Sequence, residues 1–278
     1  MKNKFAFVYT CCLFISIGLS HAQVAYNLEN EIPYYSQEQV EGDAYKESMC
    51  VLDFYYPTNV ENFPTIVWFH GGGLTSGYRE IPEYLKDKGV AVVGVGYRLS
   101  PNVKAEEAIK DAATATAWVF ENIERYGGNS SLIFVSGMSA GGYLSYMIGL
   151  DKKYLATHQI DANKIAGLIP FSGQAITHFA IREESGIPEA QPIIDELAPL
   201  YHVRADAPPL LILTGDRELE LLGRYEENAY LMRMMKVVGH NQVRLYELDG
   251  SDHGQMMYPG LPLLLREVKS LTKEILKK

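Results

Sequence analysis

Gly137-Met138-Ser139-Ala140-Gly141 is the stretch that decides the fold. It follows the apolar run Leu132-Ile133-Phe134-Val135 and precedes a segment, residues 142–147, that can form a helix. A serine between glycines at such a strand-to-helix turn is typical of a nucleophile elbow, because the tight turn forces the serine into a strained backbone conformation. Small residues also cluster in ordinary loops, so the pentapeptide predicts chemistry only if the other required groups lie elsewhere in the chain.

Apolar runs alternate with helical patterns on both sides of this stretch. Strands are predicted at residues 65–69, 90–95, 132–135, 165–169, 210–213 and 243–248. Helices are predicted at residues 104–126, 224–238 and 261–276, with Pro262 in the first turn of the last one. This alternation predicts the α/β class, with a mostly parallel sheet covered by helices on both faces. Residues 51–57 alternate as an antiparallel edge strand would, whereas residues 23–48 give no clear pattern.

The composition predicts one large domain. The chain has 278 residues, of which 47% are hydrophobic, and this is ample for a single sizeable core. Its formal net charge is −9, and no run of Lys and Arg is long enough to follow a phosphate backbone. We therefore expect no nucleic-acid partner.

The first 22 residues differ from the rest. A basic start, residues 1–4, precedes an apolar run over residues 5–19 and the small-residue end Ser20-His21-Ala22. This pattern predicts a cleaved signal peptide, residues 1–22, and a secreted or periplasmic protein whose single domain covers residues 23–278. The alternative is a membrane anchor, but roughly 15 apolar residues are few against the ~20 that a bilayer requires. We expect no stable membrane insertion after cleavage.

Cleavage would also leave a single cysteine. Cys11 and Cys12 lie inside the apolar run and would be removed with it. Cys50 would remain, without an intramolecular partner for a disulfide. Because it lies in a strand-like stretch, we expect it to be a small buried hydrophobic residue rather than a reactive thiol.

A nucleophilic serine needs a base, a residue that orients the base, and donors for an oxyanion. In open α/β sheets these groups gather at the carboxyl ends of the strands. Of the seven histidines, His253 follows the last predicted strand, in a loop with glycines on both sides. We therefore expect His253 to be the base of Ser139. The alternative is an ordinary histidine in a surface loop.

The orienting acid should follow the preceding strand. Asp216 and Glu218 both do so, in Thr214-Gly215-Asp216-Arg217-Glu218. A buried carboxylate there would hold the imidazole and stabilise its charged form. Asp216 is nearer the end of the strand, and the residues themselves leave both candidates open.

A glycine run provides candidate oxyanion donors. His70-Gly71-Gly72-Gly73 follows the predicted strand at residues 65–69. Three glycines let the backbone approach a ligand closely and turn its N–H groups toward it. The alternatives are a simple tight turn or a phosphate-binding loop, but the chain lacks the Gly-Lys pattern of the latter.

The order His-Gly-Gly-Gly, Gly-x-Ser-x-Gly, acid and histidine resembles the α/β-hydrolase fold. More narrowly, the chain resembles the branch of hormone-sensitive-lipase-like and bacterial carbohydrate esterases, over nearly all of residues 23–278. The resemblance implies that Ser139 is the nucleophile, that His253 is the base, and that the N–H groups of Gly72, Gly73 and Ala140 form the oxyanion hole. The family's second acid in this loop corresponds to Glu218. The resemblance therefore favours Glu218 as the acid. Since the family usually has Asp there, Asp216 remains a second candidate.

The resemblance implies a secreted serine carboxylesterase that works through an acyl-enzyme, without a metal or organic cofactor. Its expected substrates are small esters or acylated polysaccharide, with acetyl or feruloyl groups on plant polysaccharide favoured. The alternatives are a generic short-chain carboxylesterase, a peptidase of the same fold and a non-catalytic binding module. Residues 174–197 are polar and broken by proline, so we expect a cap-like insertion over the site rather than the apolar lid of a lipase.

Overall fold

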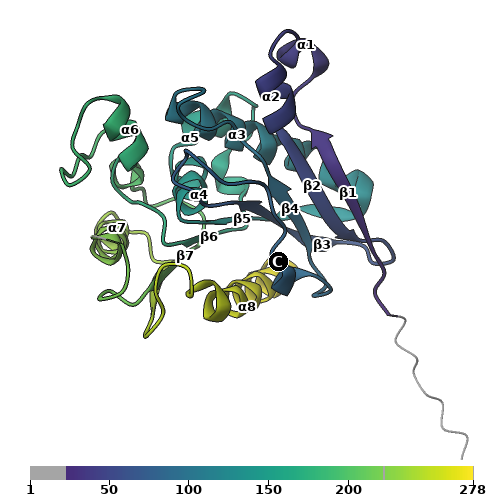
Figure 1. Ribbon diagram of the computed structural model, residues 1–278. Coiled ribbons are helices and arrows are strands. Elements are labelled where there is room, and N and C mark those ends of the chain that lie inside the picture. The colour runs from purple at the N-terminus through teal and green to yellow at the C-terminus, as the bar shows by residue number, and fades with distance from the viewer. Residues whose placement is uncertain (1–22, 222, 278) are drawn as a thin grey trace, which may run out of the picture.

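The computed structural model describes residues 23–221 and 223–277, so the predicted signal peptide, residues 1–22, lies outside the described residues. An eight-stranded sheet forms the centre of the described structure, with the strand order β1-β2-β4-β3-β5-β6-β7-β8 (Figure 1). The β1–β2 and β2–β4 pairs are antiparallel, and the other pairs are parallel. The strands are β1 (Tyr26–Pro33), β2 (Val51–Pro57), β3 (Phe63–Phe69), β4 (Ala91–Val95), β5 (Gly128–Met138), β6 (Gly167–Phe171), β7 (Leu210–Gly215) and β8 (Val243–Leu248).

Helices cover both faces of this sheet, as predicted (Figure 1). Helices α3, α4 and α7 pack on one face and α8 packs on the other. Across the described parts of the chain, every helix is too short or too polar to span a bilayer. The α-helices are α1 (Gln37–Val40), α2 (Ala44–Met49), α3 (Ala105–Asn122), α4 (Ala140–Leu150), α5 (Lys152–Ala156), α6 (Phe179–Glu184), α7 (Arg224–Val237) and α8 (Met257–Ile275). The described residues also form 3₁₀ helices: η1 (Glu83–Leu85), η2 (Ile123–Tyr126), η3 (Ala162–Lys164) and η4 (Pro199–His202).

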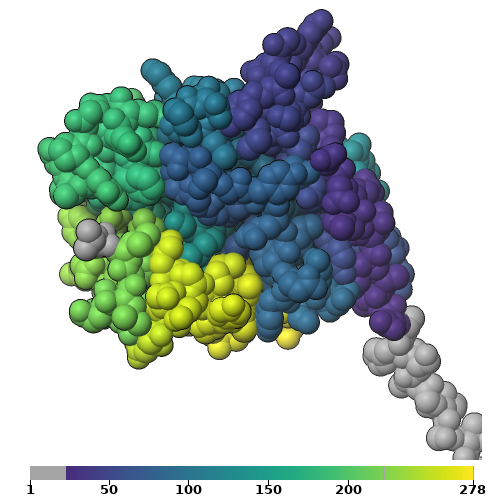
Figure 2. All heavy atoms as spheres, in the orientation of Figure 1, coloured from purple at the N-terminus to yellow at the C-terminus, as the bar shows by residue number. Residues whose placement is uncertain are grey.

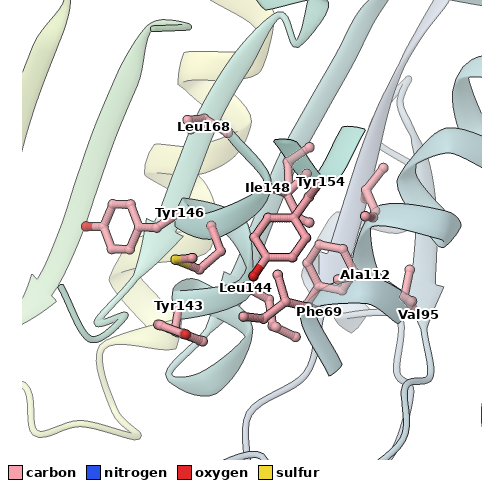
Figure 3. Close-up of a cluster of buried hydrophobic side chains, with 14 of the residues drawn as sticks. Phe69, Val95, Ala112, Tyr143, Leu144, Tyr146, Ile148, Tyr154 and Leu168 are labelled. Atoms are coloured by element: carbon pink, nitrogen blue, oxygen red, sulfur yellow. The ribbon is translucent and has the colours of Figure 1, made fainter. Parts of the chain in front are cut away.

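The central strands are buried on both faces, so each supplies two hydrophobic cores. In β3, Val67 and Phe69 belong to the core under α3 and α4, whereas Ile66 and Trp68 belong to the core under α8. Successive side chains of a strand point to opposite faces, which explains why the run reads as continuously apolar. Figure 3 shows the first core, in which side chains of α4 lie beside Phe69.

Two sequence predictions about the periphery are wrong. β2 is not an edge strand, because β1 pairs with it on the outside. Most of β1 is solvent-exposed, so its sequence lacks the apolar alternation that would have revealed a strand. Helix α8 begins at Met257, several residues earlier than predicted, and Pro262 therefore lies beyond its first turn.

A buried ion pair fixes the segment that follows β4. Arg98 donates from Nη2 to Asp111 Oδ1 at 2.7 Å and from Nε to Oδ2 at 2.9 Å. Tyr35 donates to the same carboxylate at 2.8 Å. Asp111 is fully buried on α3, so these bonds join α3 to two segments that precede it in the chain. Near this pair, Cys50 is buried and forms no disulfide within the described residues, and burial raises the pKa of its thiol to about 12.

This ion pair gives a stability prediction. Asp111→Asn should lower the free energy of unfolding by about 3–5 kcal/mol, because it removes the fully buried counter-charge of Arg98 and leaves only the half-buried carboxylate of Glu107, 3.1 Å away. Urea unfolding measures the change. The double variant Arg98→Met/Asp111→Leu removes both charges. It should lower the free energy of unfolding by less than Asp111→Asn does. A cost below about 1 kcal/mol for Asp111→Asn would contradict this role.

Candidate functional site

Ser139 occupies the tight turn between β5 and α4. Its φ is 55° and its ψ is −113°, a conformation that is strained for a residue with a side chain. A Cβ on Gly137 would lie 2.5 Å from the carbonyl oxygen of Phe69, and one on Gly141 only 2.0 Å from the same atom. Both positions therefore require glycine, and the structure confirms the predicted elbow. Ala140 is the first residue of α4, where backbone N–H groups lack partners within the helix.

His70 holds the start of the segment Gly71-Gly72-Gly73, called the glycine turn below. Burial lowers the pKa of His70 to about 4, so the ring is neutral at neutral pH. Its Nδ1 lies 2.6 Å from Gly71 O, and because a carbonyl oxygen only accepts, Nδ1 carries the proton and donates. The ring stacks on Tyr97, with centroids 4.2 Å apart, and Tyr97 donates to His70 O at 2.7 Å. These contacts direct the Gly71 carbonyl toward the imidazole.

The glycine turn lies beside Ser139. A Cβ on Gly71 would lie 3.5 Å from Ser139 Cβ. The carbonyl of Gly72 accepts a hydrogen bond from the N–H of Ser76 at 2.9 Å. In a planar trans peptide the N–H points away from the carbonyl. His70 holds the carbonyl of Gly71, and Ser76 holds the carbonyl of Gly72. The N–H of Gly72 shares a peptide unit with the first carbonyl and the N–H of Gly73 with the second. Each N–H therefore points in the opposite direction to its carbonyl.

His253 and Glu220 form a hydrogen-bonded pair. His253 Nδ1 lies 2.8 Å from Glu220 Oε2, and the Glu220 side chain is fully buried. Burial by itself would raise the pKa of Glu220, but hydrogen bonds from His253 and Ser172, together with the charge of His253, lower it to about 2. The carboxylate is thus ionised at neutral pH and accepts the Nδ1 proton. This tautomer leaves Nε2 as the basic atom of the ring.

The prediction of Glu218 as the acid, with Asp216 as the second candidate, is wrong. Glu218 is exposed, and the structure places Glu220, not Glu218 or Asp216, against the histidine. The reason is a helical turn, in which the N–H of Glu220 donates to Asp216 O at 2.8 Å and brings the fourth residue after Asp216 inward. Asp216 has a different role, because Oδ1 accepts from Glu218 N–H at 3.0 Å and Oδ2 accepts from Gly250 N–H at 2.8 Å. It ties the acid loop to the histidine loop.

Ser172 is a residue that the sequence analysis missed. It follows β6 directly, and its Oγ lies 3.2 Å from His253 Nδ1. The residue before it, Phe171, accepts a hydrogen bond from Ser139 N–H at 2.8 Å. Short contacts therefore lead from the elbow through the end of β6 to the histidine. Its place at the carboxyl end of a predicted strand was the available signal.

Residues 174–197 contain α6 and lie beside the glycine turn. A Cβ on Gly73 would lie 2.7 Å from Phe179 Cζ, so the ring of Phe179 packs directly on that glycine. Glu184 anchors the other end of α6, because its Oε1 accepts from Ser100 Oγ at 2.7 Å and from Ala105 N–H at 2.8 Å. In Figure 2 the green segment that contains α6 borders a blue segment from the first half of the chain. Helix α6 is thus held at both ends, with Phe179 against the glycine turn.

Two cavities differ in their relation to this site. One of about 420 Å³ is lined by Phe179, Glu183 and residues 186–189, and so adjoins the glycine turn through Phe179. Another of about 700 Å³ is lined by residues that include Ala166, Pro209 and Gln242, which precede β6, β7 and β8. This cavity therefore lies at the amino ends of the strands, whereas Ser139 lies at their carboxyl ends.

A matched pair of variants tests the acid. Glu220→Gln should lower the rate at which Ser139 reacts with a fluorophosphonate or with p-nitrophenyl acetate by about 10³–10⁴-fold, because a neutral amide favours the wrong tautomer of His253. Glu218→Gln, an exposed control two residues away, should change the rate by less than about twofold. Equal effects of the two variants would contradict the assignment of Glu220.

Comparisons with known proteins identify the family of this chain. The BD-FAE family model matches residues 52–221. Esterase LipC of Mycobacterium tuberculosis is 27% identical over 209 residues, which cover 69% of this chain and 51% of LipC. The chain spans about half or less of the length of the curated relatives LipC and LipM.

Solved structures share the fold. A truncated form of a carbohydrate esterase from gut microbiota superposes with a TM-score of 0.71 at 17% identity, covering 91% of this chain and 99% of that one. Est2, a thermophilic esterase from Thermogutta terrifontis, superposes with a TM-score of 0.66 at 25% identity, covering 89% and 91%. The family model alone covers more than half of the chain. The chain therefore has the α/β-hydrolase fold and belongs to the BD-FAE family.

Proposed function

We propose that the protein is an exported serine carboxylesterase that removes acetyl or feruloyl groups from plant polysaccharide. The observation that carries the proposal is the hydrogen-bonded pair of half-buried His253 and buried, ionised Glu220. The two side chains are 2.8 Å apart and follow the carboxyl ends of their strands, as the strained Ser139 does. The printed names of the relatives, esterase and carbohydrate esterase, support the reaction class. Export rests on the sequence pattern of residues 1–22.

In the proposed first step, Ser139 Oγ attacks the carbonyl carbon of the ester while its proton passes to His253 Nε2. The negative charge then moves to the carbonyl oxygen, where the N–H groups of Gly72, Gly73 and Ala140 stabilise it. Glu220 stays ionised and stabilises the charged imidazole. The carbon–oxygen bond of the leaving group breaks, and His253 gives its proton to the departing alcohol. The acyl group is now bound to Ser139.

The second step repeats this chemistry with water. His253 takes a proton from a water molecule, whose oxygen attacks the acyl carbon. The bond to Ser139 Oγ breaks, the serine recovers a proton from His253, and the free acid leaves. The step uses the same oxyanion donors and needs no further group. One arrangement therefore serves both halves of the reaction.

The cavity beside Phe179 suits the alcohol side of such an ester. Phe179 and Pro188 offer apolar surface, on which the carbon face of a sugar ring packs. Glu183 and Glu189 are exposed carboxylates at the same cavity, and carboxylates accept hydrogen bonds from hydroxyl groups. The cavity of about 420 Å³ has the size of typical small-molecule sites. These features support a neutral, hydroxylated alcohol rather than a long aliphatic one.

The proposal is tested by the release of acetate and ferulate from acetylated and feruloylated xylan. p-Nitrophenyl acetate and a matched p-nitroanilide serve as small ester and amide substrates, and Ser139→Ala is the control. We expect release of at least one acid from the polysaccharide, turnover of the small ester, little turnover of the amide, and loss of all activity in Ser139→Ala.

The other outcomes distinguish the alternatives. Turnover of the small ester without release from xylan would contradict the polysaccharide substrate and favour a generic carboxylesterase. Faster turnover of the amide would favour a peptidase. A wild-type protein that is inert toward every ester and toward a fluorophosphonate would contradict the proposed enzyme altogether.

A further inference from the structure

Ser172 has an unusual conformation for a buried serine. Its φ is 45°, in the region that favours glycine, and its side chain is fully buried. Its N–H donates to Leu213 O at 2.7 Å, and its carbonyl oxygen accepts a hydrogen bond from Arg224 Nη1. A strained residue persists only where its surroundings hold it in place. Here both sides of the peptide backbone are held.

The polar side chains that hold this loop come from α7. Arg224, Glu227 and Asn228 are spaced by three and four residues and so share one face of the helix. Arg224 donates to the carbonyl of residue 172, and Asn228 Nδ2 donates to the carbonyl of residue 173 at 2.8 Å. Glu227 Oε2 accepts from the N–H of Ala175 at 3.0 Å. Each of the three side chains thus forms a hydrogen bond with a backbone group of the loop that follows β6.

The first part of α7 differs from the usual helix on a sheet, which turns an apolar face inward, whereas its later part buries Leu231 and Met235 in the core. Arg224 and Asn228 are buried, and Tyr146 donates to Asn228 Oδ1 at 2.5 Å. Burying charged and polar groups is unfavourable unless each finds a partner. Besides Tyr146, the partners of these two side chains include the backbone carbonyls of residues 172 and 173, in the loop next to His253. The buried polar side chains at the start of α7 therefore serve to fix the position of this loop.

We propose that Ser172 is a positioning residue that fixes the orientation of the His253 ring against Glu220. The inference rests on the proposed function. Ser172 Oγ lies 3.2 Å from His253 Nδ1, the atom whose proton Glu220 accepts. A hydroxyl at that point limits rotation of the imidazole about its bond to Cβ and so fixes the direction of Nε2. The hydrogen bond from Ser172 to Glu220 also helps to keep the carboxylate ionised.

Two substitutions separate the hydroxyl from the backbone. Ser172→Ala removes the hydroxyl and keeps the strained φ, whereas Ser172→Gly removes the hydroxyl and relieves the strain. We expect kcat for p-nitrophenyl acetate to fall by about tenfold or more in both variants, which corresponds to one lost hydrogen bond to a charged group. KM should stay unchanged, because Ser172 is buried and touches no substrate. Ser172→Gly should unfold at a higher temperature than Ser172→Ala.

A spectroscopic signal tests the same point without turnover. The proton that His253 Nδ1 shares with Glu220 should give a strongly downfield proton resonance, which should shift in both Ser172 variants. Ser136→Ala is the control, since it removes another fully buried serine hydroxyl, bonded to Ile169 O on β6. The control should change stability but neither kcat nor the resonance.

Recovery of wild-type kcat in Ser172→Gly would overturn the inference, because backbone strain alone would then explain the residue. An unshifted resonance in both variants would overturn it as well. If the wild-type protein hydrolyses no ester, the proposed function fails, but the resonance still tests whether Ser172 orients His253.

Discussion

The close contact between the backbones of β3 and α4 is the constraint on which the site depends. Gly137 and Gly141 leave no room for a side chain against Phe69 O, and this contact lets the chain reverse at Ser139. A second contact of the same kind lies on the other side, where a Cβ on Gly173 would lie 2.5 Å from the carbonyl carbon of Gly142. The start of α4 is thus held between β3 and the loop after β6. These contacts bring three strand ends together at one point.

The second requirement is a buried carboxylate that remains charged. Burial opposes ionisation of Glu220, and the hydrogen bonds that it accepts from His253 Nδ1 and from Gly215 N–H at 3.0 Å outweigh that effect. Asp216 supports this arrangement at a distance, since it joins the acid loop to the histidine loop. In the proposed mechanism the same charge stabilises the imidazole when it carries two protons. The fold therefore supplies both a strained serine and a fixed negative charge.

The sequence predicted the parts of this site that depend on strand ends and chain order. Ser139 lies at the turn after β5 and His253 follows β8, as the apolar runs indicated. The acid was different, because three carboxylates stand at alternate positions from 216 to 220 and look equivalent in the sequence. A helical turn and its hydrogen bonds select Glu220. β1 escaped prediction for a related reason, since an exposed edge strand carries no clear apolar pattern.

The most direct test of the account is a crystal structure of the protein after reaction with a phosphonate ester. We expect a covalent bond to Ser139 Oγ, with the phosphoryl oxygen about 2.7–3.1 Å from the N–H groups of Gly72, Gly73 and Ala140. Glu220 should remain on His253 Nδ1. Modification of another residue, or a phosphoryl oxygen that points into solvent away from the glycine turn, would contradict the account.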